Sequence, residues 1–212
     1  MRQYLVRHGE SVYNAEARVQ GRADVSLSDL GRRQAAALAT WARSLPADVT
    51  IDEIWSSPLA RAHETATAIA RALGLPLRIE DELAELHAGI FQGRLWADLE
   101  AAFPEEVARW RSGDADYAIP GGESRAGLAA RGRAALERLA ERPARHMIVV
   151  AHGGVLTAAL GSLLGRSHPL LARAAERPFT KLPALANASL TFLDWPGPEL
   201  SAFNETEHLA AP

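Results

Sequence analysis

A short apolar run near the start of the chain ends in residues that can bind and attack a phosphate group. Residues 4–6 are Tyr, Leu and Val, and Arg7, His8 and Gly9 follow directly. An arginine can form paired, charge-assisted hydrogen bonds with phosphate oxygens, and a histidine can act as a base or a nucleophile near neutral pH. A glycine lets the backbone come close to a ligand. The segment therefore predicts an anion site at the end of a buried strand.

The same pattern occurs a second time, far along the chain. Residues 147–151 are apolar, and His152 and Gly153 follow. In an open α/β sheet, ligands bind at the carboxyl ends of the parallel strands. Two strands that each end in His-Gly would therefore place two imidazoles around one ligand. A single Arg-His-Gly tripeptide is more often a strand end that reaches solvent, so it is the repeat that favours a site.

Two further residues could complete such a site, although neither stands out by itself. Arg61 lies in the first turn of a predicted helix, where the helix dipole disfavours a cation unless an anion binds there too. Taken alone, such a residue is more often a solvated surface arginine. Cleavage of a phosphate ester needs an acid that protonates the leaving oxygen. Glu82 and Glu85 share the next loop, and composition alone does not choose between them.

The rest of the chain supplies the elements that must bring these residues together. Hydrophobic periodicity predicts strands and helices in alternation, which indicates an α/β fold with a mainly parallel sheet. Besides the two strands before His8 and His152, strands are expected over residues 51–56, 76–80, 188–195 and 199–203, and helices over 28–45, 58–73, 124–141 and 155–164. We expect residues 86–122 to form a small helical cap, inserted into a single domain that spans residues 1–212.

The composition excludes several classes of site and partner. The chain has 212 residues and a formal net charge of −3, so we expect no nucleic-acid partner. No apolar run is long enough for a membrane span. The chain has no cysteine, which excludes disulfides and thiolate metal sites and fits a reducing cytoplasm, where we expect the protein. The seven histidines lack the spacing of a metal-binding pair, so we expect no metal ion.

Four segments together form a pattern that is far more specific than any one of them. They are LVRHGES at residues 5–11, SSPLARAHETA at 56–66, GGES at 121–124 and VVAHGGV at 149–155. In this order they resemble the histidine phosphatase superfamily, also called phosphoglycerate mutase-like. The resemblance covers residues 3 to about 160. It implies a three-layer α/β/α sandwich with a mainly parallel central sheet and a small helical cap.

The resemblance also implies a role for each matching residue. His8 matches the nucleophile that becomes phosphohistidine, and Glu85 matches the general acid and base. The remaining phosphate-pocket and substrate-binding positions are matched by Arg7, Asn14, Gln20, Gly21, Arg61, His152 and Gly153. A phosphoryl group in transfer spreads its charge over three oxygens, which the two arginines and a protonated His152 could stabilise without a metal ion or cofactor. We expect a small phosphorylated metabolite as substrate, and the family also allows a homodimer.

The predicted cap favours the phosphatase branch over the mutases of the family. A mutase must hold a doubly phosphorylated acid in a closed, basic pocket. Residues 86–120 instead carry three arginines against six acidic residues, a net charge of −3 with His87 neutral. Gln92 is a contrary detail that resembles the mutases, so a cofactor-dependent phosphoglycerate mutase is the alternative. A phosphate-binding protein without catalysis ranks last, because all matching positions are intact. Substrate selectivity is expected from Arg22, His87, Phe91 and Trp96.

Overall fold

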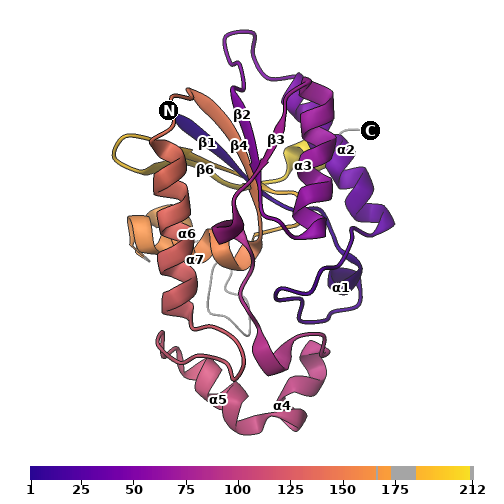
Figure 1. Ribbon diagram of the computed structural model, residues 1–212, viewed down its shortest axis with the longest axis vertical. Coiled ribbons are helices and arrows are strands. Elements are labelled where there is room, and N and C mark those ends of the chain that lie inside the picture. The colour runs from indigo at the N-terminus through magenta and orange to yellow at the C-terminus, as the bar shows by residue number, and fades with distance from the viewer. Residues whose placement is uncertain (166, 173–184, 211–212) are drawn as a thin grey trace.

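One twisted sheet runs through the molecule and carries both histidine segments (Figure 1). The computed structural model describes residues 1–165, 167–172 and 185–210. The strands lie in the order β3-β2-β4-β1-β5-β6, and their bounds are β1 Arg2–Arg7, β2 Glu53–Ser56, β3 Leu77–Ile79, β4 His146–Ala151, β5 Leu190–Asp194 and β6 Glu199–Glu205. The first four strands pair in parallel, whereas β5 is antiparallel to both of its neighbours. The prediction of a mainly parallel sheet is therefore confirmed.

Helices cover both faces of this sheet, which gives the expected three layers (Figure 1). Side chains of a strand point alternately to its two faces, and β1 is apolar on both. Tyr4 and Val6 pack in one core cluster with α2 (Asp29–Arg43) and α3 (Ala60–Leu73), while Leu5 packs in the other with α6 (Arg125–Ala140) and α7 (Gly153–Leu164). A strand that is buried on both sides holds its last residues in a fixed position.

The helix ends follow the capping chemistry of the sequence, with two differences from expectation. Ser28 and Ser124 cap α2 and α6 with their hydroxyls, and Gly74 ends α3 in the left-handed region at φ 66°. Pro58, expected at the first helical position, lies before α3, whose N-cap is Leu59. Helix α7 begins at Gly153 rather than Val155, which places His152 at the N-cap.

The segment after β3 leaves the sheet and forms the cap at one end of the molecule (Figure 1). After the short turn η1 (Asp81–Leu83), which packs on α6, the cap is built from the short helices η2 Gly89–Phe91, η3 Trp96–Asp98, α4 Leu99–Ala102 and α5 Pro104–Ser112. Its apolar side chains form a third core cluster, separate from the two that flank the sheet. The expected helical character of residues 86–122 is confirmed, and the assignment of the chain to one domain stays a prediction.

The C-terminal part completes the sheet and covers α2. The predicted strands over 188–195 and 199–203 are present as the antiparallel pair β5 and β6. Residues 207–209, expected to be frayed in part, form the short helix η4 (Glu207–Leu209), and the ring of His208 lies 6.4 Å from that of Trp41. The predicted irregular stretch over 166–183 lies largely outside the described residues, apart from helix α8 (Pro169–Ala172). Among the described helices, none has the length and apolar character of a membrane span.

Candidate active site

His8 stands at the end of β1 in a conformation suited to nucleophilic attack. Its backbone N–H donates to the carbonyl of Ala151, and its side chain is only 2% exposed. The ring nitrogen Nδ1 lies 2.6 Å from the carbonyl oxygen of Gly9. Because a carbonyl only accepts, Nδ1 carries the proton in this contact and the ring lone pair lies on Nε2. The backbone thus selects the tautomer that a nucleophile needs.

His152 lies beside His8 because β1 and β4 pair in register. Arg7 is paired with Ala151, so the next residue of each strand reaches the same edge of the sheet. The two imidazole centroids are 5.0 Å apart. His152 is fully buried, with Nε2 2.7 Å from the hydroxyl of Ser57. The two imidazoles predicted from the sequence therefore converge on one place.

The charge state of His152 is set by its burial and by its cationic neighbours. Burial lowers the pKa of His152 well below 6.5, and repulsion by Arg61, His8 and Arg7 lowers this pKa further. In the protein without ligand the ring is therefore neutral at pH 7, and a protonated His152 around the transferring phosphoryl group stays a prediction. Among the described residues, its Nδ1 has no hydrogen-bond partner.

Arg61 is a buried residue of this site and not a solvated surface arginine. Its side chain has no exposed surface, and its two terminal nitrogens donate to the carbonyls of Gly21 and Ala23 at 2.8 Å each. Burial lowers the pKa of Arg61 to about 10, and the charges of Glu85 and Asp24 oppose this shift. Arg61 is therefore still a cation at pH 7. The predicted loop residue Gly21 contributes by holding this cation.

Arg7 and Asn14 complete the polar wall on the side of β1. The buried Arg7 guanidinium donates to the carbonyl of Leu185. Asn14 lies on the short helix α1 (Val12–Ala15), and its Oδ1 accepts from the backbone N–H of Ser11 at 3.2 Å and from Nδ2 of Asn187 at 3.0 Å. These contacts occupy the amide oxygen, so the Asn14 side chain can offer an anion only its Nδ2 hydrogens.

Glu85 is the acid that the fold brings to the site. Its carboxylate accepts hydrogen bonds from the first turn of α7, at 2.9 Å from the N–H of Gly154 and 3.1 Å from that of Val155. Glu82, the other candidate, is exposed. The approach is close, since a Cβ at position 154 would lie 2.3 Å from Glu85 Oε1 and the carboxylate would have to move. The structure thus places Glu85, and not Glu82, at the site, a choice that composition alone left open.

These residues line one small cavity of about 110 Å³ between the sheet and the cap. Its walls are Arg7, His8, Asn14, Arg18, Val19, Gln20, Gly21, Arg61, Glu85, Leu86, Ala88, Trp96, Trp110, Arg125, Leu128, Gly153 and Gly154. His152 adjoins the cavity through His8. Of the side chains expected to set selectivity, only Trp96 is in this wall; Arg22, His87 and Phe91 are not.

Two wall residues on the cap side were missed by the sequence reasoning. Arg125 is 7% exposed, and its guanidinium carbon lies 3.6 Å from the centre of the Trp110 ring. Arg125 stands in the first turn of α6, the same unfavourable place for a cation that singled out Arg61, so the helix-dipole argument could have found it. Trp110 packs in the hydrophobic cluster of the cap, as aromatic residues usually do, and the tertiary fold also places it in the cavity wall.

Gly9 serves a different purpose from the one expected. It does not line the cavity. A Cβ at this position would lie 2.6 Å from the backbone oxygen of Gly31 in α2. The residue is therefore small because a helix packs against its backbone, while its carbonyl holds the ring of His8.

A larger groove of about 920 Å³ lies on the outer side of α2, against β5 and η4. Its lining includes Trp41, Phe192 and Leu209 and none of the predicted site residues. Size alone would favour this groove, but the imidazoles and buried cations are all at the smaller cavity, which is therefore the candidate active site. Among the described residues, no group of histidine and carboxylate side chains has the arrangement of a metal site.

Comparison with known proteins agrees with this geometry. A family model described as the histidine phosphatase superfamily (branch 1) matches residues 3–202. The chain belongs to this superfamily. A glucosyl-3-phosphoglycerate phosphatase of Mycobacterium tuberculosis is 38% identical over 170 residues, which cover 76% of this chain and 74% of the relative. A Yersinia enterocolitica protein named "probable phosphoglycerate mutase" is 37% identical over 221 positions, covering 99% and 95%.

Solved structures show the same fold over almost the whole chain. Mycobacterial glucosyl-3-phosphoglycerate phosphatase in complex with VO3 superposes with a TM-score of 0.77 at 36% identity, covering 97% of this chain and 99% of that one. The alpha-ribazole phosphatase of Shigella flexneri gives a TM-score of 0.79 at 28% identity, covering 97% and 96%. The chain is therefore an enzyme of the histidine phosphatase family, as the four sequence segments predicted.

Proposed function

We propose that this histidine phosphatase hydrolyses a small phosphomonoester through a phosphohistidine on His8, without a metal ion. The observation that carries the proposal is the pair of imidazoles 5.0 Å apart, with His8 in the cavity wall, His152 behind it, and the tautomer of His8 set by the carbonyl of Gly9. Arg7 and Arg61 add two buried cations to the same wall. Such a set suits the transfer of a dianionic group to a ring nitrogen.

The residues can carry both halves of the reaction. In the first half, Nε2 of His8 attacks phosphorus, the bond to the ester oxygen breaks, and the carboxylic acid of Glu85 gives its proton to that oxygen. In the second half, water attacks phosphorus, the bond to Nε2 breaks, and the Glu85 carboxylate accepts a proton from the water. Inorganic phosphate leaves, and His8 and Glu85 return to their starting states.

The charge of the transferring group is matched by groups that the fold already holds in place. Arg7, Arg61 and Asn14 line the cavity. The N–H of Gly153, the first of α7, adds the positive end of a helix dipole, whereas the N–H groups of Gly154 and Val155 are already donated to Glu85. Preorganised donors of this kind need no rearrangement as charge develops on the phosphoryl oxygens.

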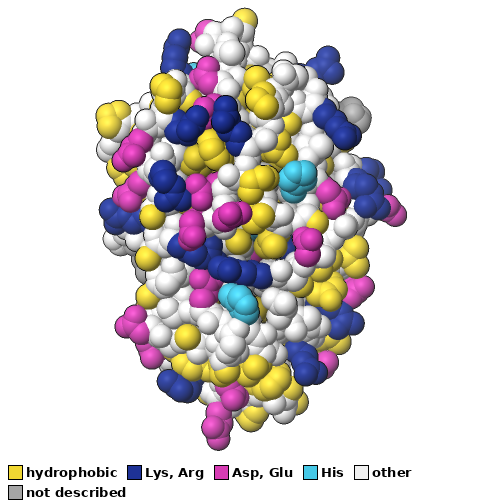
Figure 2. Space-filling model, viewed as in Figure 1, with side chains coloured by type: hydrophobic (Ala, Val, Ile, Leu, Met, Phe, Trp, Pro, Cys, Tyr) yellow, Lys and Arg dark blue, Asp and Glu magenta, His cyan; other side chains and the backbone are white. Residues whose placement is uncertain are grey.

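We place the non-phosphoryl part of the substrate against the cap side of the cavity. Trp96, Trp110 and Arg125 form this part of the wall. Two aromatic rings and a stacked guanidinium suit a small metabolite that carries an apolar or sugar-like surface and a second anionic group. The similarity to glucosyl-3-phosphoglycerate phosphatases supports such a substrate. Charged side chains of both signs are interspersed on the face shown in Figure 2, which does not suit a polyanionic partner.

The test is a phosphorus NMR time course in the presence of EDTA. The panel contains glucosyl-3-phosphoglycerate, phosphoserine, 3-phosphoglycerate with a trace of 2,3-bisphosphoglycerate, and an aryl phosphate. We expect inorganic phosphate to form, and an acid-labile, base-stable phosphoenzyme to accumulate in rapid-quench samples. His8→Ala should abolish both. Turnover by His8→Ala at the wild-type rate, or a strict need for added metal, would overturn the proposal.

A phosphoglycerate mutase is the second candidate, because the 37% identity to a protein of that description extends over 99% of the chain. In the same time course a mutase would form 2-phosphoglycerate without free phosphate. Gln92, the residue that resembles the mutases, has a structural task here, since its Oε1 accepts from the backbone N–H of Arg22 at 3.0 Å. It lies outside the cavity wall, which favours the phosphatase.

A further inference from the structure

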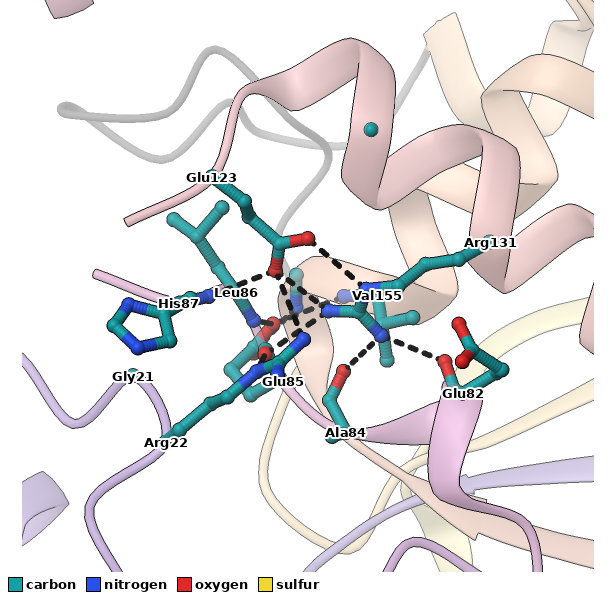
Figure 3. A network of polar contacts seen from close by, with 12 residues as sticks. Gly21, Arg22, Glu82, Ala84, Glu85, Leu86, His87, Glu123, Arg131 and Val155 are labelled. Atoms are coloured by element: carbon teal, nitrogen blue, oxygen red, sulfur yellow. Dashed lines mark hydrogen bonds and ion pairs between the residues drawn. The ribbon is translucent and has the colours of Figure 1, made fainter. Parts of the chain in front are cut away.

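Behind Glu85, on the side away from the cavity, one arginine holds the loop that carries it (Figure 3). Arg131 comes from the middle of α6, and its side chain is 13% exposed. Its Nη1 donates to the carbonyls of Glu82 and Ala84, both at 2.6 Å, and its Nη2 donates to the carbonyl of Glu85 at 3.0 Å. A single guanidinium thus binds three carbonyls of one short loop.

The guanidinium is fixed in turn by Glu123, from the Gly-Glu-Ser segment. Arg131 donates to both carboxylate oxygens of Glu123, at 3.0 Å through Nε and 2.7 Å through Nη2. Burial alone would raise the pKa of Glu123, but the hydrogen bonds from Arg131 and from the backbone N–H of His87 outweigh it, and the pKa is lowered. Glu123 is therefore ionised at neutral pH, and the forked contact leaves Arg131 little freedom to turn.

Glu85 is consequently fixed both at its side chain and at its backbone. Its carboxylate rests on the N–H groups of Gly154 and Val155, and its backbone carbonyl accepts from Arg131 and, at 3.3 Å, from Nε of Arg22. The loop around Glu85 follows the single short turn η1 and belongs to no strand. The fork of Arg131 replaces the backbone pairing that would otherwise fix such a segment.

Two other arginines of the same helix are different. Arg133 and Arg138 have side chains that are 46% and 50% exposed, and they pair with Glu137 and Glu80. Pairs as exposed as that of Arg133 with Glu137 contribute little. Arg131 is set apart from these two by its burial and by the number of loop carbonyls it binds.

We propose that Arg131, together with Glu123, is a positioning residue that holds the carboxyl group of Glu85 in place for proton transfer to the leaving oxygen. The inference rests on the proposed role of Glu85. Arg131 does not line the cavity, so it acts through Glu85 and not on the phosphoryl group. Loss of Arg131 should therefore slow only those substrates whose leaving oxygen needs a proton.

The test is the dependence of kcat/KM on the basicity of the leaving group. We compare an alkyl phosphate with 4-nitrophenyl phosphate, whose leaving group departs without help from an acid. Arg131→Gln should lower the rate on the alkyl ester about 10- to 100-fold, the range typical of a lost supporting contact, and change the aryl ester less than about threefold. Arg133→Gln, on the same helix, is the matched control and should change neither.

A double variant removes the remaining ambiguity. If Arg131 acts through Glu85, adding Arg131→Gln to Glu85→Gln should cost nothing further on the alkyl ester. Glu123→Gln gives a second, milder disruption of the same contact, so the test stands even if Arg131→Gln folds poorly. Equal loss on both esters, or additive loss in the double variant, would overturn the positioning role.

The outcomes also separate this inference from the proposed function. If Glu85→Gln slows both esters equally, or neither, the general-acid assignment of Glu85 is wrong and the inference falls with it. If Glu85→Gln is selective for the alkyl ester and the Arg131 and Glu123 variants are not, only the inference falls. Trapping of phosphohistidine on His8 is independent of both results.

Discussion

The two ends of the active-site cavity are built in different ways. At the sheet end, the proposed nucleophile and a buried cation are held by backbone groups, His8 by the carbonyl of Gly9 and Arg61 by the carbonyls of Gly21 and Ala23. At the cap end, Arg125 is held by the face of Trp110, one side chain against another. Backbone contacts survive changes of neighbouring side chains, whereas stacked side chains can be exchanged. Under our proposal, the reaction takes place at the sheet end and the cap end selects the substrate.

The largest effect is expected from the removal of Arg61, which should lower kcat/KM by the same factor for every substrate. Arg61→Met takes one buried cation from the phosphoryl pocket, and the loss of one such group costs about 10²- to 10³-fold in rate. We expect kcat/KM to fall by this factor for an alkyl and an aryl phosphate, with their ratio unchanged. Arg71→Met is the control, because Arg71 is an exposed residue of the same helix. A change in the ratio would contradict the division of tasks.

A smaller effect is expected where the sheet end meets the loop of Glu85. In Gly154→Ala the new Cβ would lie 2.3 Å from Glu85 Oε1, so the carboxylate must move while the helix stays intact. We expect kcat/KM on alkyl phosphates to fall about 10- to 100-fold and kcat/KM on aryl phosphates to be kept. In the control Gly127→Ala the nearest atom is 3.5 Å away, and a helical alanine should stabilise α6 by up to about 1 kcal/mol. Equal kinetics of the two variants would contradict the role of this contact.

The sheet end could be predicted from the sequence because its signals are local. Each histidine follows an apolar run directly, and strand register alone then brings His8 and His152 together. Helix and strand positions were predicted to within a few residues for the same reason. The neutral state of His152 could not be predicted, since it depends on burial and on Arg61 and Arg7, which approach from other parts of the chain.

The cap end was less predictable because its contacts join distant segments. The ring of Trp110 and the guanidinium of Arg125 meet only when α5 folds against the start of α6. Composition predicted a negative cap over residues 86–120, yet the cavity wall contains two arginines from outside that segment, Arg18 and Arg125. The charge around a ligand therefore depends on side chains that other segments bring to the cavity, which the net charge of the cap does not count. His87 and Phe91 are near in sequence to Glu85 and still point elsewhere.

At the cap end, Arg125→Met should change selectivity more than rate. We expect kcat/KM to fall about tenfold for a phosphate ester that carries a carboxylate and to change less than about twofold for a neutral ester, since a charge-assisted hydrogen bond is lost only in the first case. Arg109→Met is the control, because Arg109 also stacks on an aromatic ring, that of Tyr117 at 4.3 Å, but does not line the cavity. Equal losses on both esters would assign Arg125 to the reaction and weaken the comparison.

The smallest effect is expected in the protonation of His152 when an anion binds at the sheet end. The pKa of the unliganded ring is lowered by burial and by Arg61, His8 and Arg7, so an anion bound among these groups should offset the repulsion and raise it. Binding should then take up as much as about one proton at pH 6 and should tighten as the pH falls. Sulfate is the suitable probe because its own charge is constant over this range. Calorimetric titration in buffers of different ionisation enthalpy gives the number of protons taken up directly.

His152→Gln should take up fewer protons than the wild type on binding sulfate, whereas His63→Gln, an exposed position on α3, should match the wild type. Equal uptake by the wild type and His152→Gln would mean that the ring stays neutral when the anion is bound, and that the two arginines and the helix N-terminus alone balance the phosphoryl charge.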